Sequence, residues 1–267
     1  MKEKDIRTNN NIGSNRINGF GIKLLVLCFW IIVWEVLSRI VNQELFLPSP
    51  KSVLLTVLEL SKSSGFWISI ANSFMRILLG FTLGLTVGAL LAALSYKSRV
   101  IYELLSPLMK VIKATPVASF IILALVWISP VNLSILIAFL MVVPVSYLNI
   151  LHGLQSTDEK LLEMTRIFHI GGWKRCVAVY LPTVMPFVIS AISVGLGFSF
   201  KSGIAAEVIG RPLNSIGVNL YEAKLYLMIK ELFAWTLVII LLSVLFEKII
   251  MKALRHKSSI QGNTQEQ

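Results

Sequence analysis

Runs of about twenty apolar residues alternate with short polar stretches along most of this chain, and this alternation limits the folds that it can adopt. Such a run matches the hydrocarbon thickness of a lipid bilayer. Each run must be helical, because backbone groups in lipid have no water to satisfy them. The pattern predicts an all-α, polytopic membrane protein with about six transmembrane helices, at 22–41, 74–95, 114–129, 132–152, 177–199 and 231–250.

Composition indicates whether the positive charge of the chain serves nucleic-acid binding or membrane topology. Hydrophobic residues make up 55% of the chain and charged residues only 15%, against roughly a quarter in soluble domains. The formal net charge is +11, but the cations lie between the apolar runs and the aromatic residues lie within them. A nucleic-acid-binding domain would combine cations and aromatics on a soluble face. We therefore expect membrane lipid, and no nucleic acid, around this chain.

The distribution of cations predicts the orientation. Both termini and the loops 96–113 and 152–176 hold 17 of the 25 Lys and Arg residues. Because an excess of these residues marks cytoplasmic loops, both termini are predicted to be cytoplasmic. The chain divides into a flexible basic N-terminus (1–21), a six-span domain (22–250) with a cytoplasmic loop at 153–175, and a cytoplasmic C-terminal tail (251–267).

Residues that perform catalysis or bind metal form no recognisable group. Cys28 and Cys176 show neither pairing nor metal spacing, and the three histidines are scattered. The chain contains no GxxxxGK[ST] loop for nucleotide phosphates. We expect no metal, no cofactor and no catalytic residue, so the chain is not predicted to be an enzyme by itself.

One charged segment separates two apolar runs, and it includes EMTRIFHIGGWKRCVAVYLP from Glu163 to Pro182. Ser156, followed three residues later by Glu159, predicts a capping box that begins a helix. Gly171 and Gly172 are the stop expected after it, because glycine tolerates left-handed backbone. The sequence therefore predicts a short cytoplasmic helix within 156–172.

This helix is predicted to be amphipathic, which leaves two interpretations open. It either lies on the lipid headgroups or docks onto a soluble partner. Its acidic residues slightly favour docking, because membrane-surface helices are usually more basic. The apolar face contains Leu161, Met164, Thr165 and Phe168, and the polar face contains Glu159, Glu163 and Arg166.

The charged segment resembles the signature loop of the permease subunits of bacterial ATP-binding-cassette (ABC) importers. That loop reads E-A-A, three residues, G, about nine residues, then an apolar residue and L-P. Glu163 stands at the E and Leu181-Pro182 at the L-P. Met164 and Thr165 replace the two alanines, and His169 replaces the glycine.

Further stretches resemble the nitrate, sulfonate and taurine branch of that family. They are LPSPKSVL at Leu47–Leu54, NSFMRILLGFTLGLTVGALL at Asn72–Leu91, the stretch around Thr115-Pro116, and GFSFKSGIAAEVIG at Gly197–Gly210. The last of them resembles a family segment that ends in a small residue and Glu. Agreement in order and spacing covers roughly residues 45 to 250.

The resemblance implies a type I ABC importer permease fold with a cytoplasmic coupling helix, in the plasma membrane of a bacterium. Two such subunits, here expected as a homodimer, would form the passage. Each coupling helix would sit in a cleft of an ABC ATPase subunit, two copies per complex, and ATP hydrolysis would belong to that partner. An extracytoplasmic substrate-binding protein would deliver a small anion or organic solute such as a sulfonate, taurine or nitrate.

By the same resemblance, the residues expected to couple to the ATPase are Glu163, Arg166, Phe168, His169, Gly171 and Gly172. Glu163 is the first candidate for the contact, with Arg166 on the same polar face. The alternative for these two is a solvated charge pair at i, i+3, which stabilises a helix only slightly.

Lys201 and Glu207 are candidates for the substrate passage, because a charge at membrane depth is costly unless it faces a partner or an aqueous cavity. The alternative is that both are structural, near the outer interface. Gly80, Gly84 and Gly88 repeat every four residues, and this spacing predicts close helix packing within the subunit or against a second one.

Three other functions remain as alternatives. A self-sufficient secondary transporter or channel would need coupling-ion carboxylates in the spans, which contain almost none apart from Glu35. A membrane-embedded enzyme would need a catalytic group. A scaffold would recruit a partner without transport.

Overall fold

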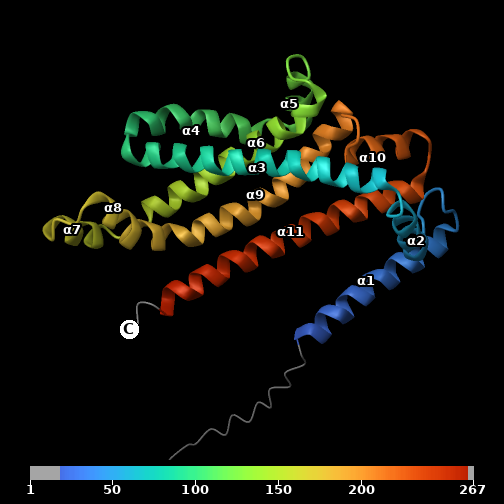
Figure 1. The fold of residues 1–267 in the computed structure, drawn as a ribbon, viewed down its shortest axis with the longest axis horizontal. Helices are drawn as coiled ribbons and strands as arrows, with labels where there is room; N and C mark the ends of the chain where they lie inside the picture. Colours follow the sequence, from blue (N-terminus) through green and yellow to red (C-terminus); the bar gives the residue numbers. More distant parts are fainter. Residues whose placement is uncertain (1–18, 264–267) are drawn as a thin grey trace, which may run out of the picture.

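The computed structural model describes residues 19–263, and every regular element within that range is a helix (Figure 1). The predicted all-α class is therefore confirmed. Of the predicted terminal segments, residues 1–18 and 264–267 lie outside the described range. The helices are α1 (Gly19–Val41), α2 (Pro50–Leu60), α3 (Ser64–Lys97), α4 (Arg99–Ala114), α5 (Val117–Ala124), α6 (Pro130–Gln155), α7 (Glu159–Ile167), α8 (Gly172–Arg175), the π-helix η1 (Cys176–Tyr180), α9 (Leu181–Gly210), α10 (Ile216–Leu225) and α11 (Ile229–Asn263).

The long helices α3, α6, α9 and α11 run along the length of the molecule (Figure 1). α6 packs against both α3 and α9, and these two contacts are the most extensive between any helices. At one end lie α7, α8 and the turn between α3 and α4, and we call it the α7 end. At the other end lie α2 and α10, and we call it the α10 end.

The glycine repeat of α3 is the reason that α3 and α6 approach so closely. A Cβ atom added at Gly84 would lie 2.8 Å from the Val142 Cβ, and one at Gly80 would lie 2.8 Å from the Ala138 Cβ. Both distances are shorter than carbon atoms can adopt without displacement. The predicted small-residue packing is confirmed, and its partner is α6 of the same subunit.

Replacing Gly88 with alanine is expected to destabilise the protein by about 1–3 kcal/mol, because a core this tight has no room for a methyl group. Its Cβ would lie 2.6 Å from the Ser146 Cβ and 2.7 Å from the Val143 carbonyl oxygen. The measurement is the thermal unfolding midpoint of detergent-purified protein. Gly197→Ala is the matched control, because no atom lies within 4 Å of a Cβ there. Equal midpoints for the two variants would contradict the prediction.

Membrane-spanning capacity is strong in the described residues. Four helical stretches are long and apolar enough to cross a bilayer, namely Gly21–Val41, Ser64–Lys97, Pro130–Gln155 and Gly172–Gly210. The bent pair α4–α5 would make a fifth. The sixth predicted span, 231–250, falls within α11, where Leu232 to Phe246 contains no charged residue.

The single helix predicted over 114–129 is wrong. The chain turns by 99° between α4 and α5 instead. Pro116 disfavours helical backbone at the residue before it, and Thr115 is accordingly extended, with φ −78° and ψ 130°. α5 then ends at Ala124, so the predicted third span is replaced by two short helices that meet at a sharp bend.

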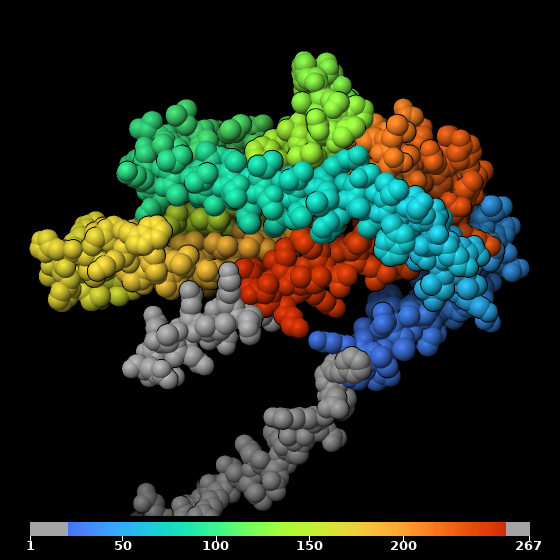
Figure 2. Space-filling model, viewed as in Figure 1, coloured from blue at the N-terminus to red at the C-terminus, as the bar shows by residue number. Residues whose placement is uncertain are grey.

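α1 diverges from the bundle, and only its C-terminal half is tied to the rest of the chain (Figures 1 and 2). The Trp34 indole N–H donates to the Pro48 carbonyl (3.1 Å), and its ring lies 6.1 Å from that of Phe233 on α11. The Ser38 hydroxyl donates to the Leu47 carbonyl (2.9 Å). Trp30 remains 63% exposed, as expected of a helix whose sides face lipid or another subunit.

Candidate functional site

The charged segment after α6 folds as predicted into a short helix, α7, but it begins differently. The side chain of Asp158 caps it by accepting the N–H of Lys160 (2.9 Å). The predicted capping box is wrong, because Ser156 ends α6 and its hydroxyl donates back to the Gly153 carbonyl (2.9 Å). A residue that closes one helix is not free to cap the next.

Both faces of α7 are largely exposed. Glu163 and Arg166 lie on the exposed polar side, and the apolar Met164 and Phe168 are 45% and 69% exposed. Only Thr165 is buried, at 1% exposure, and its hydroxyl donates to the Leu162 carbonyl (2.7 Å). The helix therefore sits on the bundle by a narrow edge and presents both charged and apolar side chains outward.

α7 ends in a Schellman motif that is centred on His169. The Ile170 N–H donates to the Thr165 carbonyl (2.9 Å), and the His169 N–H donates to the Arg166 carbonyl (3.1 Å). His169 has a φ of 51°, the left-handed conformation that glycine adopts most easily. This geometry explains why the related signature has glycine at this position, and why histidine, which tolerates the conformation better than most residues, can replace it.

Gly171 and Gly172 do not provide the left-handed stop that the sequence predicts. Gly171 is extended, with φ −57° and ψ 150°, and precedes α8, which begins at Gly172. A Cβ at either position would meet no atom within 4 Å. The prediction was wrong because His169, two residues earlier, already reverses the chain.

Replacing His169 with glycine is expected to stabilise the end of α7 by about 1 kcal/mol, because a non-glycine residue in left-handed backbone costs about 1–2 kcal/mol. His169→Val should have the opposite sign, since a β-branched residue fits this conformation poorly. Hydrogen exchange of the α7 amides would measure both changes. Unchanged protection in the two variants would show that the turn is not under strain.

The signature Leu181-Pro182 lies where η1 becomes α9. Pro182 has no N–H to donate to the carbonyl four residues earlier, and a π-helical turn accommodates such a missing bond. The ring of Tyr180 in η1 packs edge-on against that of Tyr96 in α3, with centroids 5.8 Å apart. This contact ties the segment after α7 to the end of α3.

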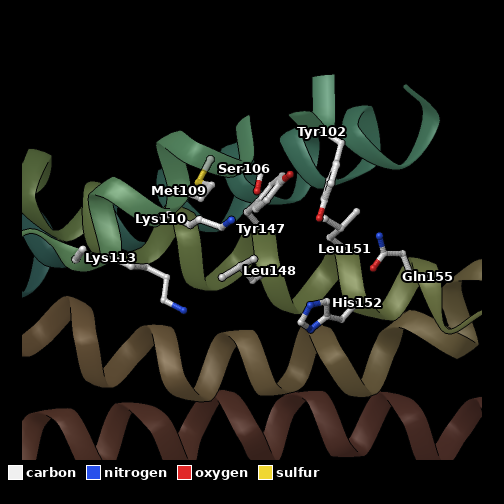
Figure 3. A pocket seen from close by; sticks show the side chains of 11 residues that line it. Tyr102, Ser106, Met109, Lys110, Lys113, Tyr147, Leu148, Leu151, His152 and Gln155 are labelled. Atoms are coloured by element: carbon white, nitrogen blue, oxygen red, sulfur yellow. The ribbon is translucent and has the colours of Figure 1, made fainter. Parts of the chain in front are cut away.

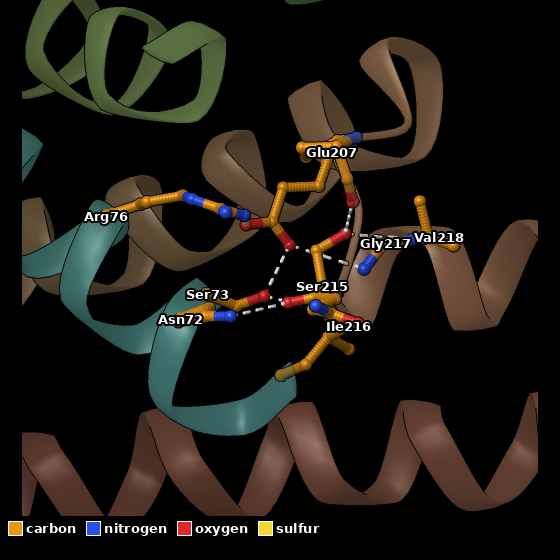
Figure 4. Close-up of polar contacts among 10 residues, drawn as sticks. Asn72, Ser73, Arg76, Glu207, Ser215, Ile216, Gly217 and Val218 are labelled. Carbon is orange, nitrogen blue, oxygen red and sulfur yellow. Dashed lines mark hydrogen bonds and ion pairs between the residues drawn. The ribbon is translucent and has the colours of Figure 1, made fainter. Parts of the chain in front are cut away.

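A second constellation lies near the α10 end, around Glu207 (Figure 4). Its carboxylate is fully buried and accepts the Ser73 hydroxyl (2.6 Å) and the Gly217 N–H (3.3 Å). The Arg76 guanidinium lies 3.5 Å from its other oxygen. The carboxylate also faces the N-terminus of α10, where the helix dipole favours negative charge. Glu207 thus joins α3, α9 and α10.

Supporting contacts fix the loop before α10 in this constellation. Ser73 also accepts the Ile216 N–H (2.9 Å), and the Asn72 amide donates to the Asn214 carbonyl (3.1 Å). Ser215 caps α10 by accepting the Val218 N–H (3.1 Å). Every buried polar group here has a partner, as a low-dielectric interior requires.

The two candidates for the substrate passage, Lys201 and Glu207, have different environments in the structure. Lys201 lies on α9 with its side chain exposed, whereas Glu207 is fully buried by α3 and α10. The cation beside Glu207 is Arg76, not Lys201. Sequence reasoning missed both Arg76 and Ser73 as partners of Glu207, although opposite charges in two apolar segments were a signal that Arg76 and Glu207 pair.

Among the residues that the structure describes, no three His, Cys, Asp or Glu side chains are placed to hold an ion. The candidate sites are therefore an exposed helix at one end and a buried ionic cluster at the other.

Comparison with known proteins accounts for this architecture. A profile of the family "Binding-protein-dependent transport system inner membrane component" matches residues 68–259. The chain belongs to this family. The match includes α7 and the Glu207 cluster, so both constellations lie within the part of the permease that the family describes.

Individual relatives confirm the resemblance to permeases of the nitrate, sulfonate and taurine branch. The permease is 25% identical over 90% of its length to the "Putative aliphatic sulfonates transport permease protein SsuC" of Bacillus subtilis (strain 168), of which 88% is covered. It is 23% identical to the taurine transport system permease protein TauC of Escherichia coli (strain K12), over 85% of the chain and 83% of that protein. It is 22% identical to the nitrate import permease protein NrtB of Synechocystis sp. (strain ATCC 27184 / PCC 6803 / Kazusa), over 72% and 71%.

Proposed function

We propose that this permease is the membrane subunit of an ATP-driven ABC importer, and that α7 is the contact through which a separate ATPase subunit moves its helices. The exposure of α7 carries the proposal. Glu163, Arg166 and Phe168 face away from the bundle, on a helix that is closed by a cap at one end and by the turn at His169 at the other. A helix held in this way transmits an applied displacement instead of absorbing it.

In this proposal the α7 end is cytoplasmic. The excess of Lys and Arg in the loops of that end supports the assignment. Gly171 and Gly172 belong to the same contact, because their open surroundings let a partner surface approach the backbone there.

The cargo is proposed to be a small anion such as a sulfonate, taurine or nitrate. Relatives that carry these names support the class. Lys201 supports it as well, because its exposed charge lies about two and a half turns before the end of a spanning helix. A lysine at that depth needs a partner or an aqueous space. We therefore place Lys201 in the passage. Glu207 is proposed to lie next to the passage, where it holds α3, α9 and α10 together.

The complete importer is proposed to contain two copies of this permease, two ATPase subunits and a substrate-binding protein outside the cell. The family description names dependence on a binding protein. A passage between two copies would cover the exposed Lys201, which one copy leaves uncovered. Each of the two ATPase subunits needs one coupling helix, and this chain supplies a single one. Two copies of the chain, a homodimer, are therefore expected.

Purification of the tagged protein in mild detergent, as wild type and as Glu163→Lys, tests this function. The wild type is expected to retain a soluble ATPase and Glu163→Lys to lose it, because charge reversal opposes whatever group meets Glu163. Glu59→Lys is the matched control, because Glu59 is an exposed glutamate of α2 at the opposite end. Retention of the ATPase by Glu163→Lys would remove Glu163 from the contact. A stable wild type without any ATPase would favour a self-sufficient transporter.

A further inference from the structure

A cavity of about 520 Å³ lies between α4 and α6, a volume typical of small-molecule sites (Figure 3). Its lining residues with polar groups are Tyr102, Ser106, Lys110 and Lys113 from α4, with Tyr147, His152 and Gln155 from α6. The α4 residues are three or four positions apart and therefore lie on one face of the helix, and this face lines the cavity. In the view of Figure 3 the Lys110 side chain reaches from α4 toward α6, whereas Lys113 and His152 extend past α6.

The charge of the cavity has a single sign. Lys110 and Lys113 line it, and no Asp or Glu does. The sequence explains the two lysines equally well as interfacial cations, but their placement adds a constraint. α4 and α5 together form a candidate broken span, and a lysine carried into a span faces a partner or water. Both lysines are exposed and line the cavity, which is one space that they can face.

Apolar side chains from both helices also line the cavity. They include Met109, Leu148 and Leu151, and Met109 and Leu151 are almost fully buried. A cavity that is lined by both cations and apolar side chains suits a molecule with an anionic group and an apolar part. An inorganic anion would use only the cations.

The lining residues nearest to the α7 end are exposed, so the cavity can be entered from that end. Tyr102 and Gln155 lie nearest to that end, and Lys113 lies about 16 Å further along α4 at 1.5 Å per residue. If the α7 end is cytoplasmic, the cations lie at the inner end of a cleft that is accessible from the cytoplasm. This step rests on the proposed function.

We propose that this cleft is a binding site for a small organic anion with a short apolar tail, reached from the cytoplasmic side. The anionic group binds Lys110 and Lys113, and the tail packs against Leu148 and its neighbours. The cleft is therefore a second anion site, between α4 and α6 and distinct from Lys201 on α9. It would hold cargo that has crossed the passage, or sense how much of that cargo the cytoplasm contains.

Equilibrium binding to the purified full-length protein tests the site, with butanesulfonate, methanesulfonate and nitrate as probes and dimethyl sulfone as a neutral probe. Butanesulfonate is expected to bind at least about tenfold more tightly than methanesulfonate, because it buries three more methylene groups. Lys113→Gln and Lys110→Gln are each expected to weaken butanesulfonate binding about tenfold, the loss of one charge-assisted hydrogen bond. Leu148→Ala should reduce the preference for the longer probe and leave methanesulfonate binding unchanged.

Lys97→Gln is the matched control, because Lys97 is an exposed lysine at the same end and does not line the cleft. Three results would each overturn the proposal: no saturable binding to the wild type, equal binding by the Lys113→Gln and Lys97→Gln variants, or nitrate as the tightest ligand. Displacement of butanesulfonate by phosphatidylglycerol in nanodiscs would assign the cleft to lipid headgroups and also overturn it.

The Glu163→Lys variant separates this proposal from the proposed function. Binding in the absence of ATP does not require the ATPase, so this variant should bind butanesulfonate as the wild type does. A wild-type protein that binds the probe and retains no ATPase would leave the site standing and remove the importer. Retention of the ATPase without binding would do the reverse.

Discussion

Replacing Arg76 with alanine is expected to lower the free energy of unfolding by about 3–5 kcal/mol, because it leaves the buried carboxylate of Glu207 without its cation. The Arg76 side chain is only 14% exposed and the Glu207 side chain is fully buried. Ser73 and the Gly217 N–H would still donate to the carboxylate, but neither cancels its charge. Unfolding titrations in mixed micelles would measure the change.

Arg99→Ala is the control for this prediction. Arg99 also lies near a glutamate, Glu103, but the two side chains are 92% and 65% exposed, so their separation should cost less than about 1 kcal/mol. The double variant Arg76→Met with Glu207→Gln should recover most of the lost stability, because it removes both charges together. An Arg76→Ala variant as stable as Arg99→Ala would show that Glu207 does not depend on its ion pair.

Replacing Gly217 with alanine is expected to cost about 3 kcal/mol or more, the upper range for overpacking a core. The new Cβ would lie 2.5 Å from the backbone carbonyl carbon of Glu207 and 2.6 Å from the Val208 nitrogen. Backbone atoms of α9 cannot turn aside as a side chain can. α10 would have to move away, and its N-terminus would no longer face the Glu207 carboxylate.

The thermal midpoint of the purified protein measures this loss, and Gly65→Ala provides the control. A Cβ at Gly65 would meet only the Ser63 hydroxyl, at 3.5 Å, which is an ordinary contact. Ser73→Ala is a useful third variant, because it removes a hydrogen bond to Glu207 without crowding α10. If Gly217→Ala is no less stable than Gly65→Ala, the close contact between α9 and α10 is not required.

Hydropathy predicted the helical class and the approximate place of four of the six spans, because a span needs only length and apolar composition. It also predicted the face of α3 that carries Gly80, Gly84 and Gly88, since a repeat of four residues lies on one side of a helix. The partner of that face could not be predicted. Its identity depends on which helix lies alongside, and that is decided by the whole fold.

Local signals failed where two explanations competed for the same residue. Ser156 could close α6 or begin α7, and only the path of the chain decides between them. His169 carries the left-handed turn that glycine usually carries, so the two glycines that follow attracted the prediction. The partnership of Arg76 with Glu207 spans 131 residues, a distance that no local pattern covers.

The contact between α3 and α6 has a mechanical consequence. Three glycines let the backbone of one helix rest on the other, with no flexible side chains between them to absorb a displacement. The pair should therefore move as one stiff beam. α3 has 34 residues, about 51 Å of helix, so a tilt of about 5° at its α7 end would carry the other end through about 4 Å. The Glu207 cluster, which fastens α3 to α9 and α10, lies toward that far end.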